Sequence, residues 1–257
     1  MKTIYILLIA SIFSTTSFAQ YFTIDTIKGE SPYNKQVSFI FPHLSNTANQ
    51  ANADVINKEL TKSILDVELG QQTRSIFEKV WGSQEMDIAA LSDISFKVMN
   101  NDPDFFCISI SATGCGAYCE AWTQYYTYES SSGRKVKLQD FFTSTGLQKI
   151  SDSVKAMKAR AIQDYTSKLK ASLDKGALSP EDKADYAQAI ELLNKCTDAT
   201  IHQDALAYSF SNKVLTIHLD KCLPHAIRFL DKVDYSFSFD NNTYRDYLTD
   251  YGKSLLH

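Results

Sequence analysis

The stretch from residue 105 to residue 142 constrains the fold of this chain more than any other part. It reads FFCISISATGCGAYCEAWTQYYTYESSSGRKVKLQDFF. An apolar run leads into a tight loop of glycine and cysteine, an aromatic run follows, and a Ser-Ser-Gly turn precedes a short final run. Runs rich in β-branched and aromatic residues, separated by residues that favour turns, predict an antiparallel meander.

The periodicity of apolar residues predicts the remaining elements. Alternation indicates strands at residues 21–28, 35–41 (ended by Pro42), 93–99, 205–211, 214–219 and 233–239. Apolar residues three or four positions apart indicate helices at residues 49–69, with an extension over 75–81, and at 150–173, 180–196 and 243–255. Strands cluster and helices cluster. The pattern therefore predicts an α+β fold, with a mainly antiparallel sheet, helices packed on one face and a helical hairpin insertion.

The first 19 residues have the features of a signal peptide. Lys2 precedes an apolar run at residues 4–13, and Ser17-Phe18-Ala19 offers small residues before Gln20. The run is shorter than the roughly 20 residues of a membrane-spanning helix, and no later segment is long and apolar enough to span a membrane. We expect cleavage before Gln20, a periplasmic or secreted protein, and no membrane anchor after cleavage.

Composition indicates an ordered domain with a mild acidic excess. Apolar residues make up 44% of the chain, which has nine glycines and five prolines. Loss of Lys2 with the signal segment would take the formal charge from −4 to −5, which disfavours a nucleic-acid partner. Residues 20–257 are predicted to form one α+β domain, with 20–103 and 104–257 as alternative subdomains.

Five cysteines are present, so an oxidising compartment would leave at least one unpaired. We predict disulfides between Cys115 and Cys119 and between Cys196 and Cys222. Cys107 lies within a predicted strand, where a free thiol behaves as a small buried apolar side chain.

Two features of the meander are candidates for ligand binding. Gly114 and Gly116 would let backbone N–H groups approach a ligand. Tyr118, which directly precedes Cys119, would stack on a sugar or contact a protein. The alternative is a hairpin connection held by the disulfide. Trp122 begins a row of alternating aromatic residues, which is either a carbohydrate platform or part of the core.

No catalytic or metal-binding motif is recognisable. His218, Cys222 and His225 have a spacing that superficially resembles a zinc site, but Cys222 has a disulfide partner in Cys196. The chain lacks the common sequence signatures of metalloproteases, serine hydrolases, and phosphate- or dinucleotide-binding enzymes. We therefore assign no catalytic residue, no metal and no cofactor.

The order of these pieces resembles the extracytoplasmic domain shared by PdaC-type peptidoglycan deacetylases and RsiV-type anti-sigma factors. In that family a Gly-Gly-Ala-His loop, an aromatic strand, a Ser-Gly turn and a Leu-x-Asp-Leu-Phe segment follow one another. The matching residues are Gly114-Cys115-Gly116-Ala117-Tyr118, Tyr125 to Tyr128, Ser132-Gly133-Arg134-Lys135 and Leu138-Gln139-Asp140-Phe141-Phe142. Leu223-Pro224-His225-Ala226 resembles the family's proline-containing loop. Tyr118 stands where the family has histidine.

The resemblance implies binding rather than catalysis. The family domain binds lysozyme in the anti-sigma factors and accompanies a separate enzymatic domain in the deacetylases. The expected function is an exported, non-catalytic binding module for a cell-envelope protein or glycan, with a lysozyme-like muramidase or a peptidoglycan fragment as the partner. Tyr118, Trp122, Pro224 and His225 are the candidate contacts. The alternatives are a hydrolase that acts on envelope material and a structural envelope protein.

Overall fold

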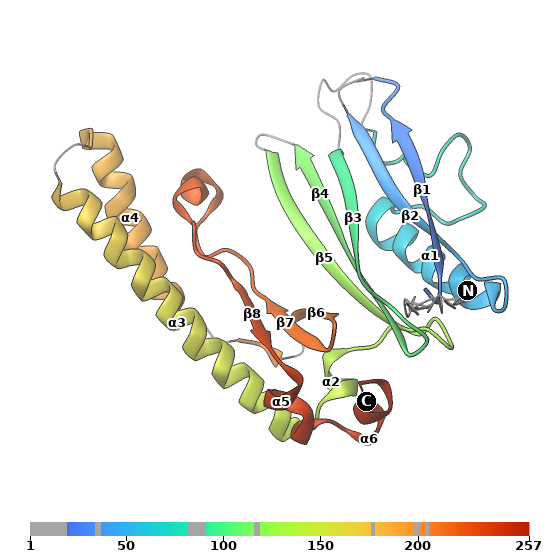
Figure 1. Cartoon of the computed structure of the whole chain (residues 1–257). Helices are drawn as coiled ribbons and strands as arrows, with labels where there is room; N and C mark the ends of the chain where they lie inside the picture. The colour runs from blue at the N-terminus through green and yellow to red at the C-terminus, as the bar shows by residue number, and fades with distance from the viewer. Residues whose placement is uncertain are drawn as a thin grey trace, which may run out of the picture.

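The computed structural model describes residues 20–33, 37–81, 91–115, 119–175, 178–197, 201–203 and 206–256. The predicted signal segment, residues 1–19, lies outside the described residues. The α+β class is confirmed, with mainly antiparallel strands and packed helices. The strands form two sheets (Figure 1), a division that the sequence pattern does not indicate.

The larger sheet contains the predicted meander. Its strands are β1 (Thr23–Glu30), β2 (Ser38–Ser45), β3 (Leu91–Asn101), β4 (Phe105–Cys115) and β5 (Cys119–Glu129), in that spatial order. All neighbours are antiparallel except β2 and β3, which pair in parallel over Ser38 and Phe39 only. The register of β4 with β5 runs unbroken from Phe105 opposite Glu129 to Cys115 opposite Cys119.

Helix α1 (Gln50–Leu65) packs on one face of this sheet and closes the first core. Ile56 and Leu60 of α1 meet Ile108 and Ile110 of β4, all fully buried. Asn57 completes the contact, because its side chain both accepts from the Leu44 N–H (2.9 Å) and donates to the Leu44 carbonyl (2.8 Å). A buried amide that satisfies a strand edge in this way replaces the missing neighbour of β2.

The second sheet consists of β6 (Ala207–Ser211), β7 (Val214–His218) and β8 (Ser236–Phe239). Its apolar face packs against Phe105 and Cys107 of β4, together with α2 (Leu138–Phe141) and the start of α3 (Ser144–Asp174). The C-terminal segment closes this second core with α5 (Asn241–Tyr244), the 3₁₀ turn η3 (Arg245–Tyr247) and α6 (Asp250–Leu255).

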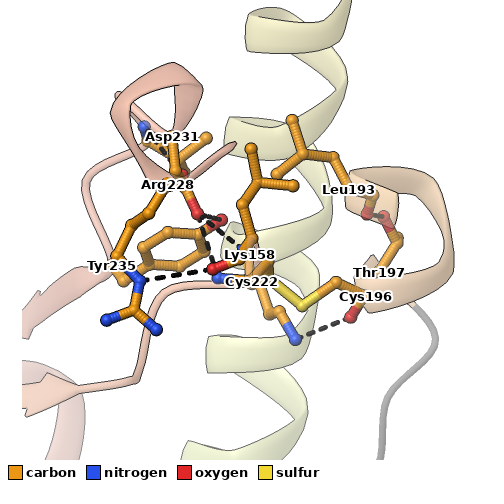
Figure 2. Close-up of a disulfide and its surroundings, with 10 residues drawn as sticks. Lys158, Leu193, Cys196, Thr197, Cys222, Arg228, Asp231 and Tyr235 are labelled. Carbon is orange, nitrogen blue, oxygen red and sulfur yellow. Dashed lines mark hydrogen bonds between the residues drawn. A yellow bond between two sulfur atoms is a disulfide. The ribbon is translucent and has the colours of Figure 1, made fainter. Parts of the chain in front are cut away.

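Helix α4 (Pro180–Thr197) and α3 form the predicted hairpin, and the first part of α3 packs on the side of the second sheet away from the larger sheet (Figure 1). A third core joins this hairpin to residues 219–235, which include the 3₁₀ helix η2 (His225–Leu230). The disulfide between Cys196 and Cys222 ties α4 to that segment (Figure 2). Beside it, buried Lys158 donates to the Cys196 carbonyl (2.6 Å), and burial lowers the pKa of its amine.

Three predictions of element boundaries are wrong. Pro42 lies inside β2, where it is tolerated because β3 pairs only with residues Ser38 and Phe39. Residues 75–81 form turns instead of a helix, and the Glu78 carboxylate accepts the N–H groups of Thr73 and Arg74 there. The predicted helix at 243–255 is broken, because the Thr249 side chain caps a new helix at the Gly252 N–H.

Replacing Tyr128 with Phe is expected to raise the free energy of unfolding by up to about 1 kcal/mol. Tyr128 is fully buried, and its hydroxyl has no hydrogen-bond partner among the described residues, so the wild type bears a desolvation cost that Phe removes. Urea denaturation measures the change. Tyr126→Phe is the matched control and should lose stability, because the Tyr126 hydroxyl donates to Gln124. A marked loss of stability in Tyr128→Phe would contradict the prediction.

Candidate functional site: a cleft between the two sheets

A cleft of about 800 Å³ lies between β5 and the wall formed by the second sheet and residues 219–228. Its size is within the range of ligand-binding pockets. The wall on the β5 side includes Ser111, Thr123 and Tyr125, and the opposite wall includes His218 and Ser236. The cleft is therefore rich in hydroxyl groups.

The alternation of side chains along β4 explains why this wall is polar. Odd-numbered residues face away from α1, and among these Phe105 and Cys107 are buried under the second sheet. After the buried Ser109, the outward residues of the strand are Ser111 and Thr113, which line the cleft. Apolar side chains occupy the covered half of the face and hydroxyl side chains the open half.

His218 and Tyr125 form the centre of the cleft. Their rings stack in parallel, with centroids 3.7 Å apart. Both ring nitrogens of His218 are engaged, Nε2 with the Ser209 hydroxyl (2.9 Å) and Nδ1 with the Ser236 hydroxyl (3.1 Å). Burial lowers the pKa of His218 to about 4, so the imidazole is neutral near pH 7.

The neutral state of His218 predicts an acid-sensitive contribution to stability. Its pKa in the folded chain is below the ordinary value of 6.5, so the unfolded chain binds more protons between these values. Stability should therefore fall as the pH drops from about 6.5 to about 4. Because His218 is only half-buried, we expect about 1–2 kcal/mol.

Urea denaturation of wild type and His218→Gln at pH 7 and pH 4 tests this. The free energy of unfolding should fall less between pH 7 and pH 4 in His218→Gln than in the wild type, by about 1–2 kcal/mol. The control is His202→Gln, at an exposed histidine away from the cleft lining, which should match the wild type. Equal losses in all three proteins would contradict the assignment.

Two cross-links join the walls at the N-terminal end of β5. His225 Nε2 donates to the Cys119 carbonyl (3.0 Å), and Arg228 forms an ion pair with Glu120. The Arg228 guanidinium lowers the pKa of the Glu120 carboxyl. These contacts close one end of the cleft.

Asp231 organises the segment that forms the far wall. Its buried carboxylate accepts the N–H groups of Cys222 (3.0 Å) and Leu223 (3.1 Å) and the Tyr235 hydroxyl (Figure 2). Its backbone carbonyl accepts from the Lys221 amine (2.9 Å). One carboxylate thus orders the chain on both sides of η2.

The residues predicted as contacts lie in different places. Trp122 and His225 line the cleft, and Pro224 precedes η2 outside the lining. Gly114 pairs with Glu120 at the end of β4. Gly116 and Tyr118 lie outside the described residues, so their role stays a prediction.

The aromatic row of β5 divides between surface and core. Trp122 is 37% exposed, whereas Tyr126 and Tyr128 are buried under α1. Both predicted disulfides are present, and Cys107 is a buried free thiol whose pKa is raised by burial. Among the described residues no cluster of potential metal ligands occurs and no helix is suited to crossing a bilayer.

Sequence reasoning missed the pairing of His218 with Ser209 and Ser236 and the stacking on Tyr125. No sequence motif places a nucleophile next to a base, whereas the fold brings the Ser236 hydroxyl to His218 in the cleft. These residues lie on four strands, and Tyr125 on β5 is far in the chain from Ser209, His218 and Ser236 on β6, β7 and β8. The strand alternation places Ser236 and His218 on polar faces, which is the only local signal.

The fold and the cleft together define an α+β chain with a ligand-sized cleft between two sheets. A scan against protein-family models finds no match, and a search of curated proteins finds none either. Among solved structures, the chain is similar to a member of the DUF3298 family from Bacteroides fragilis, with a TM-score of 0.56 and 12% identity over 90% of this chain and 95% of that one. A DUF3298 family protein from Pseudomonas aeruginosa gives a TM-score of 0.49 and 11% identity over 90% and 95% of the two chains.

The comparison with the Bacteroides fragilis structure shows that this chain has the fold of a DUF3298 family protein. That family includes the extracytoplasmic domains of the PdaC and RsiV proteins. At this level of identity the likeness concerns the fold alone.

Proposed function

We propose that the chain is an exported, non-catalytic binding module for a cell-envelope protein or glycan, with the cleft beside β5 as its binding site. The observation that carries the proposal is the cleft of about 800 Å³, whose walls are cross-linked at one end by His225 and Arg228. A ligand-sized cleft held in shape before the ligand arrives reduces the entropic cost of binding.

The chemistry of the lining also supports binding. Hydroxyl groups and the aromatic rings of Tyr125 and Trp122 are the groups that recognise sugars and peptides. Both ring nitrogens of His218 are occupied by serines, and a pKa of about 4 makes it a weak base at neutral pH.

Export is supported by the signal-peptide pattern and by the two disulfides, which are typical of proteins outside the cytoplasm. The resemblance to the PdaC and RsiV domains, together with the DUF3298 fold, supports the envelope as the setting. It also makes a lysozyme-like muramidase the first partner to test.

The test is a calorimetric titration of residues 20–257 with a lysozyme and, separately, with muropeptides. We expect one of them to bind, and His225→Ala and Tyr118→Ala to weaken that binding by about 2 kcal/mol each if the two side chains are hot spots. His202→Ala is the matched control outside the cleft lining. Absence of binding to either ligand would contradict the proposal, whereas unchanged affinity in both variants would reject only these contacts.

A hydrolase is the second candidate, because the Ser236 hydroxyl lies 3.1 Å from His218 Nδ1 in the cleft. The same titration distinguishes the two functions. Consumption of muropeptides that stops in Ser236→Ala would favour the hydrolase, whereas binding without turnover favours the module.

A further inference from the structure

The outer edge of β5 carries unpaired backbone groups in the stretch of the strand whose residues line the cleft. Further along this strand, Thr127 accepts from the Val136 N–H and Glu129 donates to the Arg134 carbonyl, both on the side away from β4. At the other end, the Cys119 carbonyl accepts from His225 on that side. The register with β4 has no bulge, so the odd-numbered residues between these points also direct their N–H and C=O groups outward.

The odd-numbered residues in question are Ala121, Thr123 and Tyr125, all of which line the cleft. Within the described part of the chain, no backbone group pairs with their outer edge. Proteins usually protect such edges with proline, lysine, a bulge or a covering segment. Between Cys119 and Thr127 the strand has no proline, no lysine and no bulge.

Resting on the function proposed above, we propose that this edge binds an extended peptide segment of the partner protein, which enters the cleft as a sixth strand of the larger sheet. Backbone groups that repeat every second residue match the hydrogen-bonding pattern of a peptide strand. A glycan presents hydroxyl and N-acetyl groups on its rings, not a backbone whose N–H and C=O groups recur at the two-residue spacing of a strand. The peptide therefore fits these groups better than a sugar does.

The shape of the cleft favours a single peptide strand over a second copy of this chain. The edge of β5 faces the wall that contains His218 and Lys221, and the contact of His225 with Cys119 crosses one end. Pairing of two β5 strands requires an open edge, which the opposite wall obstructs, whereas a single extended segment is the smaller occupant of the cleft of about 800 Å³.

Two further observations describe the peptide. Trp122 is 37% exposed on β5, on the face opposite Thr123, and offers an apolar contact to the neighbouring side chain of an added strand. The cleft lining holds three carboxylates, Asp93, Glu120 and Asp220, against two cations: Arg228, which pairs with Glu120, and Lys221, which donates to the Asp231 backbone carbonyl. A segment that carries lysine or arginine is therefore favoured over an acidic one.

The test uses a synthetic library of acetylated decapeptides that alternate Lys or Thr with Val or Tyr. Residues 20–257 are titrated with the best binder of the library, and affinity is followed by calorimetry and by tryptophan fluorescence. In the same peptide, N-methylation of every second residue in one register removes the donors that face β5, and in the other register it leaves them intact. We expect the register that removes the donors facing β5 to lose affinity about tenfold or more. The register that leaves these donors intact should change affinity by about twofold or less.

Variants of the protein provide a second test. Ala121→Pro removes one outward N–H without breaking the ladder with β4, because that N–H points away from β4. Ala121→Pro should weaken binding of the peptide by about tenfold or more. Ala121→Val, which keeps the N–H, should change the affinity for the peptide by about twofold or less. Circular dichroism establishes that both variants are folded.

The outcomes separate this inference from the function on which it rests. Register-dependent loss upon N-methylation together with loss in Ala121→Pro supports the peptide strand. The inference is overturned if no library peptide binds, if both methylation registers weaken binding equally, or if the edge pairs two copies in a concentration-dependent dimer. Binding of muropeptides that Ala121→Pro leaves unchanged would also overturn it, while the proposed binding function would stand.

Discussion

Asp231→Ala is expected to lower the free energy of unfolding by about 3–5 kcal/mol, because it leaves several buried donors without an acceptor. The Asp231 carboxylate is fully buried and accepts from Cys222 N–H, Leu223 N–H and the Tyr235 hydroxyl. These groups lie on both sides of η2, so their loss should also loosen the wall of the cleft that faces β5.

Urea denaturation measures the stability change, and titration with the ligand found for the wild type measures the effect on the cleft. Asp220→Ala is the matched control, since this exposed carboxylate lies in the same segment and makes no ion pair with a described residue. It should change stability by about 0.5 kcal/mol or less. A similarly small change in Asp231→Ala would show that the carboxylate does not organise the segment.

Removing the disulfide between Cys196 and Cys222 in the double variant Cys196→Ala, Cys222→Ala is expected to cost about 3 kcal/mol. The bridge joins residues 26 positions apart and restricts a long loop in the unfolded chain. In the folded chain it holds α4 against the segment that begins after β7, next to the contact of Lys158 with the Cys196 carbonyl (Figure 2).

The other disulfide supplies the control. Cys115 and Cys119 are only four positions apart, so Cys115→Ala, Cys119→Ala should cost about 2 kcal/mol or less. Thermal and urea unfolding under oxidising conditions compares the two double variants. A larger loss from the short loop than from the long one would contradict the loop-entropy argument for this chain.

Local patterns in the sequence were enough to predict most of the secondary structure. The meander of β3, β4 and β5 and the hairpin of α3 and α4 follow from side-chain periodicity and turn residues, which act over a few positions. The disulfide pairs were also predicted. In two of the three wrong predictions distant contacts decided: Thr249 starts a new helix where Leu248 pairs with Phe142, and Pro42 fits because β3 does not extend along it.

The candidate site was predicted only in part. His225 and Trp122 line the cleft, as candidate contacts should, but the groups at its centre were not foreseen. His218 meets Tyr125 from a different sheet, and Asp231 orders a segment that has almost no regular structure. No local signal marks such contacts.

The sequence by itself therefore determined the periodicity of the strands and helices and the polarity of each face, because these depend on neighbouring residues; the cysteine pairing was predicted from the five cysteine positions. Only the tertiary structure decided that the strands divide into two sheets and that the hydroxyl-rich half of β4 and β5 faces a second wall. The physical reason is that a polar strand face has the same sequence pattern whether it faces open solvent or a cleft. Which of the two occurs depends on how distant apolar faces pack together.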